Sequence, residues 1–208
     1  ALVQRLREMG GSTRFGCEVG HFKLRGQQAR HLETSQGAIE ADAYVIAAGL
    51  ASRTLAQSIG DRLPLYPVKG YSLTLRIKDS ERAPRTNVTD LQTKTVFAPL
   101  GPLLRVAARA ELVSKDLSIP AARIAHMLET VERLFPGACD LAEPRPWAGL
   151  RPCTPDSVPI VRPSAACNVF INAGHGALGF TLAAGSARLL ADLMASAGPA
   201  PTRWRCPR

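Results

Sequence analysis

The chain has 208 residues, of which 46% are hydrophobic, and it carries a formal net charge of +9. This length and composition predict a soluble globular protein with a hydrophobic core, made of one large domain or two small ones. The basic residues are spread along the chain without the interleaved aromatics of a nucleic-acid-binding stripe, so we expect no nucleic-acid partner.

The first sixty residues predict a helix, a small meander and a buried strand. Leu2, Leu6 and Met9 recur at helical spacing before two glycines, which predicts a short opening helix. Residues 19–24 and 29–34 have the composition of strands and predict an antiparallel meander. The apolar run that follows, residues 44–48, ends at Gly49 and predicts a strand buried on both faces. A helix is expected over residues 52–59.

The middle of the chain predicts an antiparallel sheet with one helix packed on it. Apolar and polar residues alternate over residues 71–78, which is typical of a half-exposed strand. Two more strands are expected over residues 93–98 and 103–110, separated by a turn at Gly101-Pro102. A helix begins after Pro120, and its predicted core face comprises Ile124, Met127, Leu128, Val131, Leu134 and Phe135.

The last third begins with a proline-rich extended stretch, residues 144–163. A buried strand over residues 169–172, a loop over residues 173–179 and a helix to about residue 195 follow. Residues 197–208 predict a disordered tail that is rich in proline and arginine. The basic tail is compatible with peripheral contact with anionic lipid.

The loop before the last helix reads Gly174-His175-Gly176-Ala177-Leu178-Gly179, which matches the G-x-G-x-x-G pattern of dinucleotide-binding folds. That fold also needs a second parallel strand after the helix, and here the chain passes from the helix into the tail. Closely spaced glycines before a helix still let backbone N–H groups approach an anionic or planar ligand. The alternative is that these glycines only form a tight turn between the strand and the helix.

Four motifs resemble the flavoprotein family of D-amino acid, glycine and sarcosine oxidases, and within it the small subunit of bacterial D-amino acid dehydrogenases. They read LYPVKGYSLT at 65–74, WAGLRP at 147–152, TPD at 154–156 and NAGHGALGFT at 172–181. The resemblance extends from Ala1 to about Met194. It implies an FAD-dependent enzyme and, because these motifs follow the family's N-terminal βαβ unit, a chain that lacks that FAD-binding segment.

The resemblance implies several contacts with the cofactor. Val19 matches a residue whose backbone meets the adenine, and Gly49 matches the turn beside the phosphate and ribose part. The glycine loop and the following helix start match the segment that lies against the flavin ring, so the implied contacts are Gly174, Gly176, Ala177, Leu178, Gly179, Phe180 and Thr181.

The resemblance also implies the substrate contacts. Arg151 matches the position that binds the substrate carboxylate, a task suited to the guanidinium group. Arg105 lies where some members place a basic group near the flavin, with an ordinary surface charge as the alternative. Lys69 and Tyr71 either reach the site or have a structural role, which we favour. We expect His175 to orient the loop by a hydrogen bond.

The predicted fold is therefore mixed α+β, with a partial FAD-binding domain at residues 1–62, a substrate-binding domain at 63–148 and a return to the FAD-binding domain at 149–196. Two family glycines are replaced by Ala107-Ala108, and a third by Ser157, which leaves the substrate open. Because the phosphate-binding unit is absent from the sequence, we expect this chain alone to be inactive.

The function implied is oxidative deamination of a D-amino acid to a 2-oxo acid and ammonia, by hydride transfer to the flavin N5. A respiratory quinone is the expected electron acceptor. The alternatives are an oxygen-using glycine or sarcosine oxidase and a non-catalytic isolated domain.

Five cysteines occur without a C-x-x-C pair or zinc-ligand spacing, so we expect free thiols and no metal. No stretch approaches the roughly 20 apolar residues of a membrane span. A cytoplasmic location follows, with peripheral attachment at the inner membrane as a further expectation.

Overall fold

The computed structural model describes residues 1–112 and 115–196, and of Arg109 only the backbone. The chain divides into two compact units. The first unit comprises Ala1–Pro64, Pro159–Ala173 and the chain from Phe180, and the second comprises Leu65–Val158 and Gly174–Gly179. The assignment of FAD-binding and substrate-binding roles to separate parts of the chain stays a prediction. The predicted disordered tail lies outside the described residues.

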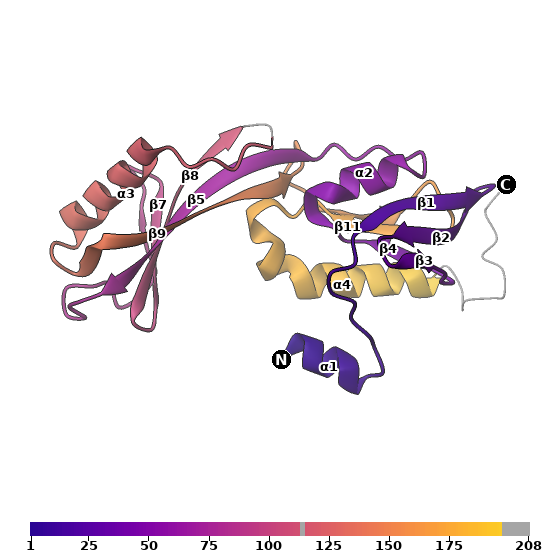
Figure 1. Ribbon diagram of the computed structural model, residues 1–208, viewed down its shortest axis with the longest axis horizontal. Coiled ribbons are helices and arrows are strands. Elements are labelled where there is room, and N and C mark those ends of the chain that lie inside the picture. The colour runs from indigo at the N-terminus through magenta and orange to yellow at the C-terminus, as the bar shows by residue number, and fades with distance from the viewer. Residues whose placement is uncertain (113–114, 197–208) are drawn as a thin grey trace. The chain divides into compact units, whose positions relative to one another are not determined.

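The first unit begins with the expected helix and meander (Figure 1). Helix α1, Leu2–Glu8, precedes the three-stranded antiparallel sheet β1-β2-β3. Its strands are Val19–Arg25, Gln28–Thr34 and Gly37–Ile39. The turn between β2 and β3 is fixed by the Thr34 hydroxyl, which donates to the Gly37 carbonyl at 2.6 Å. This local hydrogen bond is typical of Ser and Thr in turns.

A second sheet of the first unit has the order β10-β11-β4. Its strands are Ile160–Pro163, Val169–Ala173 and Tyr44–Ile46. Strand β11 pairs with β4 in parallel and with β10 in antiparallel orientation. The expectation that both faces of β4 are buried is wrong, because Val45 is 42% exposed while Tyr44 and Ile46 are buried. Strand β4 is at the edge of this sheet, so one face and one edge of it lack a covering element within the unit.

Two polar contacts hold the first unit together across long sequence separations. The buried Asn168 amide donates to the Ala29 carbonyl at 2.9 Å, and its Oδ1 accepts from the Ala29 N–H at 2.8 Å. Arg162 of β10 forms two hydrogen bonds of 2.9 Å to the Asp61 carboxylate, just after helix α2, Ser52–Gln57. Both contacts satisfy polar groups that would otherwise be buried without partners.

The second unit is built on one five-stranded antiparallel sheet in the order β6-β7-β8-β5-β9. Strand β5, Tyr66–Ile77, lies between β8, Leu103–Leu112, and β9, Cys139–Cys153. On the other side of β8 lies β7, Thr95–Leu100, and then the edge strand β6, Val88–Asp90. The prolines in residues 144–153 suggested only an extended stretch, but β9 pairs with β5 along most of its length. Proline is tolerated there because β9 is an edge strand.

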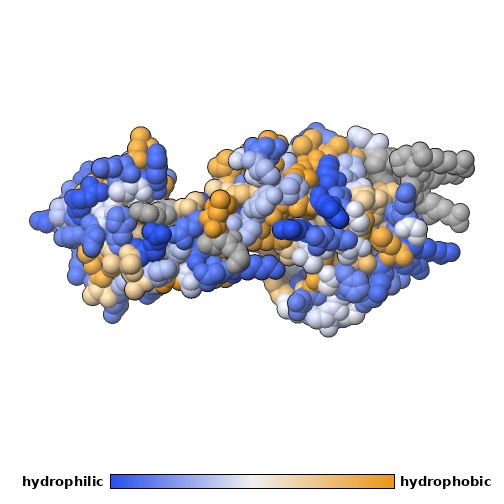
Figure 2. Space-filling view, turned by 90° about the horizontal axis from the view of Figure 1, so that it is seen from above, coloured by the Kyte–Doolittle hydropathy of each residue, from blue (hydrophilic) through white to orange (hydrophobic). Residues whose placement is uncertain are grey.

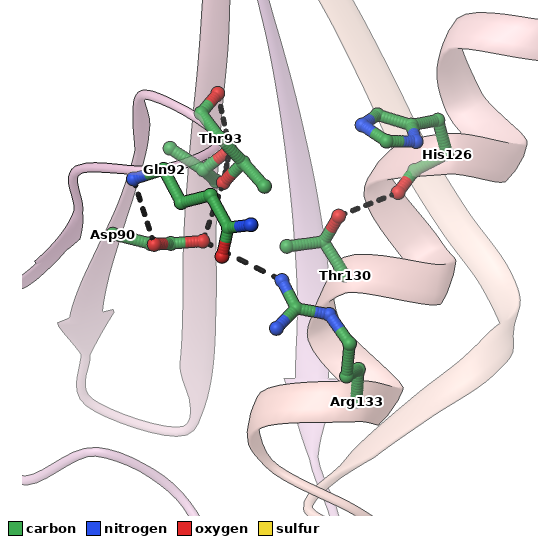
Figure 3. A network of polar contacts seen from close by, with 7 residues as sticks. Asp90, Gln92, Thr93, His126, Thr130 and Arg133 are labelled. Atoms are coloured by element: carbon green, nitrogen blue, oxygen red, sulfur yellow. Dashed lines mark hydrogen bonds and ion pairs between the residues drawn. The ribbon is translucent and has the colours of Figure 1, made fainter.

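Helix α3, Ala121–Leu134, packs on one face of this sheet through the side chains expected from the sequence. Met127 and Val131 are buried, and the other predicted apolar side chains pack against the same core. At the end of the helix, Arg133 reaches the Asp90 carboxylate at 3.5 Å, and Asp90 also accepts from the Thr93 hydroxyl at 2.7 Å (Figure 3). These contacts attach the β6–β7 hairpin to the helix.

Antiparallel sheets together with four helices in the described residues confirm the mixed α/β fold. The last helix, α4, is Gly179–Ser196, close to the predicted end. Hydrophobic residues lie on the surface of the first unit, as Figure 2 shows. In α4 the side chains of Phe180, Leu182 and Leu189 are exposed, and Leu190 is the only buried residue of that helix.

The expectation that no segment suits a membrane span was wrong, because one helix is long and apolar enough to cross a membrane. Residues 176–196 form a 21-residue helical stretch that contains an 18-residue window with a mean hydropathy of 1.2. Core helices of soluble proteins meet the same criterion, so the finding by itself assigns no membrane role. Cys17, Cys139 and Cys153 are free as expected, whereas Cys167 is disulfide-bonded and departs from the expectation.

Candidate functional site in the second unit

The sheet of the second unit has a second face, opposite α3, which carries polar and charged side chains. Because side chains alternate along a strand, Tyr71 and Leu73 point to the core while Ser72 points to the other face. The register places Trp147 directly opposite Ser72 and Arg105 opposite Thr74. No helix of this unit covers that face within the described residues. We call it the open face.

Two paired glycines shape the centre of the open face. Gly70 of β5 lies directly opposite Gly149 of β9. A Cβ atom on Gly70 would lie 2.8 Å from Nη2 and 3.0 Å from Cζ of Arg151, so the guanidinium occupies the space that a side chain would fill. A Cβ atom on Gly149 would lie 2.1 Å from the Trp147 ring. The two glycines therefore form a recess in which an indole and a guanidinium lie side by side.

Arg105 extends over the same face from β8. Its Nη2 donates to Ser72 Oγ at 2.9 Å, and its Cζ lies 5.6 Å from the centre of the Trp147 ring. This distance is within the range of a cation–π interaction. These two contacts hold the guanidinium of Arg105 at the sheet surface, whereas an ordinary surface arginine would extend into solvent.

Lys69 and Tyr71 lie on the opposite face, which agrees with the structural role favoured from the sequence. The Lys69 ammonium is buried, donates to Asp116 at 2.9 Å and lies 5.2 Å from the centre of the Tyr71 ring. The Tyr71 hydroxyl donates to Glu111 at 2.6 Å, and this hydrogen bond raises the pKa of Tyr71. The Ser118 N–H and the Lys69 ammonium lower the pKa of Asp116 to about 2. These groups connect β5 to its neighbours behind the open face.

The glycine loop lies next to the end of β9. Gly174 and Gly176 have φ angles of +83° and +54°, a conformation that favours glycine. His175 forms an isolated antiparallel bridge with Cys153, and a Cβ atom on Gly176 would lie 3.3 Å from Cys153 Sγ. Because Arg151 is two residues before Cys153 on β9, the loop and Arg151 are attached to the same strand end.

The short 3-10 helix η2, Gly176–Leu178, presents backbone donors immediately before α4. The Leu178 amide donates to the His175 carbonyl at 3.0 Å. The Ala177 amide has no backbone acceptor among the hydrogen bonds of the described residues, whereas the backbone beside it takes part in the His175–Cys153 bridge. Leu178 is 56% exposed. This segment therefore offers a free N–H group next to apolar surface, which suits a planar ligand with polar edges.

The remaining predicted cofactor contacts belong to the first unit. Phe180 is 95% exposed and Thr181 follows it in the first turn of α4. Gly49 begins the 3-10 helix η1, Gly49–Ala51, with a φ angle of +56° and nothing within 4 Å of a Cβ position. Val19 begins β1 and is partly exposed. The role of these four residues in binding FAD stays a prediction.

Two buried polar atoms near the glycine loop lack partners in the described structure. They are Oδ1 of Asn172 and Nε2 of His175. Atoms of this kind fit a ligand that supplies both donors and acceptors, such as the polar edge of a flavin. We expected His175 to orient the loop by a hydrogen bond, but its Nε2 atom forms none in the described structure. No group of three potential metal ligands occurs among the described residues.

Sequence reasoning did not assign Gly70 or Gly149, although both lie within the motifs at 65–74 and 147–152. The signal available was a glycine in the middle of a strand, which indicates that something approaches the backbone closely. At Gly70 the approaching side chain is Arg151 of the neighbouring strand β9, which only the register reveals, and at Gly149 it is Trp147 of the same strand.

Comparisons with known proteins support the resemblance. A family model described as DAO, FAD dependent oxidoreductase, matches residues 1–193. A D-amino acid dehydrogenase of Chromohalobacter salexigens is 42% identical over 200 residues, which are 96% of this chain and 48% of the relative. One of Cereibacter sphaeroides is 43% identical over 195 residues, which are 93% of this chain and 45% of the relative. The chain thus spans about half the length of these relatives.

Solved structures share the fold. The glycine oxidase of Bacillus cereus superposes with a TM-score of 0.76 at 20% identity, over 90% of this chain and 52% of that one. The L-proline dehydrogenase of P. horikoshii superposes with a TM-score of 0.81 at 17% identity, over 94% and 54%. The family model covers nearly the whole sequence, and this chain therefore belongs to the DAO family of FAD-dependent oxidoreductases.

Proposed function

We propose that this chain forms the substrate-binding part of an FAD-dependent enzyme that oxidatively deaminates D-amino acids. Family membership supports the redox chemistry, and the 42% identity to D-amino acid dehydrogenases supports the substrate class. The observation that carries the proposal is the Arg151 guanidinium, which lies over Gly70 on the open face, on the strand end that bridges to the glycine loop.

Arg151 binds the α-carboxylate of the substrate. A guanidinium presents several N–H donors in one plane and accepts a carboxylate through two parallel hydrogen bonds. Arg151 takes part in none of the ion pairs among the described residues, so its donors are available to a ligand. The Trp147 ring beside it supplies an apolar surface for the rest of the substrate.

Glycine-loop amides hold the cofactor. The free N–H group of Ala177 and the backbone of Gly176, just before the last helix, would bind the polar edge of the isoalloxazine ring, and Leu178 and Phe180 would cover apolar parts of it. Gly174, Gly179 and Thr181 belong to the same segment, while Val19 and Gly49 are proposed contacts for the adenosine part. When bound, FAD supplies a two-electron acceptor at its N5 atom.

The reaction requires the chain to orient the substrate more than to abstract protons. With its carboxylate held by Arg151, the substrate in its neutral amine form would be oriented to give its Cα hydrogen as a hydride to bound FAD, while the nitrogen lone pair forms the C=N bond of an iminium ion. Loss of one proton to solvent would give the imine. Water then adds to the imine and releases a 2-oxo acid and ammonia. No basic side chain is needed for the hydride step.

The electron acceptor is proposed to be a respiratory quinone, because the relatives are dehydrogenases and not oxidases. A cytoplasmic location with peripheral contact at the inner membrane stays a prediction. Production of hydrogen peroxide at the rate of substrate consumption would instead favour the oxygen-using alternative.

The proposal is tested by Arg151→Met in the natural protein loaded with FAD. We expect the kcat/KM for D-alanine with an artificial electron acceptor to fall about 100-fold or more, since a charge-assisted contact to the carboxylate is lost. Arg145→Met on the same strand is the matched control and should leave kcat/KM unchanged. An Arg151→Met enzyme that keeps its activity would disprove the assigned role.

A further inference from the structure

Four arginines lie along the open face, and they fall into two groups. Arg76 and Arg145 line a shallow polar cleft together with the carboxylates of Asp140 and Glu143. Arg105 and Arg151 have no carboxylate partner among the described residues; the polar contact of Arg105 is with the Ser72 hydroxyl. Two positive charges are therefore left without a counter-charge at the centre of the face.

The register of the sheet fixes the spacing of these two guanidinium groups. Arg151 reaches over Gly70 from β9, and Arg105 reaches Ser72 from β8. Gly70 and Ser72 are next neighbours on one face of β5, and such neighbours are separated by roughly 7 Å. The two guanidinium groups approach β5 from opposite sides and contact these two positions.

The Trp147 ring lies beside both groups. The ring covers Gly149, which pairs with Gly70, the residue that lies under Arg151. The centre of the ring is 5.6 Å from Cζ of Arg105. The centre of the open face therefore presents a cation, an apolar ring and a second cation. A ligand of matching chemistry has two anionic groups joined by a short aliphatic chain.

We propose that the preferred substrates of this site are amino dicarboxylic acids of the size of glutamate. Arg151 binds the α-carboxylate, Arg105 binds the side-chain carboxylate, and the indole of Trp147 covers the methylene groups between them. This inference rests on the role proposed above for Arg151 and adds the recognition of the side chain by Arg105.

The position of the two guanidinium groups against buried residues of the sheet makes this recognition selective. Ser72 and Gly70 are buried beneath them, and the Ser72 hydroxyl holds Arg105 in place. A substrate with an apolar side chain leaves Arg105 without an anionic partner, whereas a second carboxylate supplies one.

The experiment compares binding of glutarate and butyrate to the natural protein loaded with FAD, by titration calorimetry and by the change in flavin absorbance. We expect glutarate to bind more tightly than butyrate. Arg105→Gln should weaken glutarate binding roughly 10- to 100-fold, the value of one charge-assisted contact, and leave butyrate binding unchanged. Arg105→Lys should restore part of the affinity, and Arg145→Gln should change neither ligand.

Three results would overturn the inference. Equal weakening of both ligands by Arg105→Gln means that both arginines clamp one carboxylate. Unchanged binding of both means that Arg105 has only a structural role. Wild-type protein that binds butyrate as tightly as glutarate also contradicts it. Failure of the underlying function gives a different result, namely that Arg151→Met leaves the binding of butyrate unchanged.

Discussion

Because Gly70 has no side chain, the Arg151 guanidinium can lie directly over the backbone of β5. The φ angle of Gly70 is not in the left-handed region, so an L-residue is compatible with its backbone. The presence of glycine at position 70 is explained by Arg151, three atoms of which lie within 3.2 Å of the place that a Cβ atom would occupy. Gly70 is therefore needed for the geometry of the site and not for the backbone of the strand.

We predict that Gly70→Ala impairs binding more than folding. The methyl group displaces the flexible end of Arg151, which costs little stability but moves the guanidinium from its position. The affinity for a carboxylate ligand should fall about tenfold or more, measured by titration calorimetry. Gly185→Ala is the control, because nothing lies within 4 Å of its Cβ position in α4. It should leave binding unchanged and stabilise the helix by about 0.5–1 kcal/mol. Unimpaired binding in Gly70→Ala would contradict this account.

At the scale of elements, the ion pair between Asp61 and Arg162 joins the end of α2 to β10. Asp61 is 10% exposed in its side chain, and its carboxylate also accepts from the Ala165 N–H at 3.2 Å. The Arg162 hydrogen bonds hold the pKa of Asp61 below the ordinary value of 3.8. A lowered pKa in the folded state means that the pair stabilises the fold fully above pH 3.8 and loses this effect as the pH falls through the lower folded value.

We predict that Asp61→Ala lowers the free energy of unfolding by about 2 kcal/mol near neutral pH, since a buried charge-assisted pair is lost. The difference from wild type should shrink in acid, below pH 3.8. Urea unfolding at several pH values measures both effects. Asp192→Ala is the control, because its pair with Arg188 on α4 is exposed and should contribute under about 0.5 kcal/mol. A pH-independent difference between Asp61→Ala and wild type would show that the carboxylate charge is not responsible.

The sequence predicted helices better than it predicted strand pairing. The apolar period of residues 124–135 identified the core face of α3, because helical spacing is set by the residues themselves. Strand β9 was not recognised as a ladder partner, since its prolines hide the alternation and its partner β5 is some 75 residues away in the numbering, from Ser72 to Trp147. Arg151 was found through its motif, whereas the recess that positions it depends on the pairing of Gly70 with Gly149.

At the scale of the molecule, the net charge of +9 favours the approach of anionic ligands to either unit. The open face has the same sign as the whole chain. We predict that binding of glutarate weakens as salt is added, because raising the ionic strength from about 0.01 M to about 1 M shortens the Debye length from roughly 30 Å to roughly 3 Å. The neutral diamide of glutarate, measured in parallel by calorimetry, should show no such trend. Equal salt dependence of the two ligands would exclude an electrostatic origin.

Strand β4 has a consequence for handling the protein. As the outermost strand of β10-β11-β4 it carries backbone donors and acceptors without a neighbour in its sheet, and its Val45 side chain is exposed. Its length of three residues limits unwanted pairing, but it contains no proline, lysine or bulge of the kind that other natural edge strands use. A preparation of these 208 residues at high concentration should therefore self-associate by adding strands between molecules, and soluble material is best sought at low protein concentration.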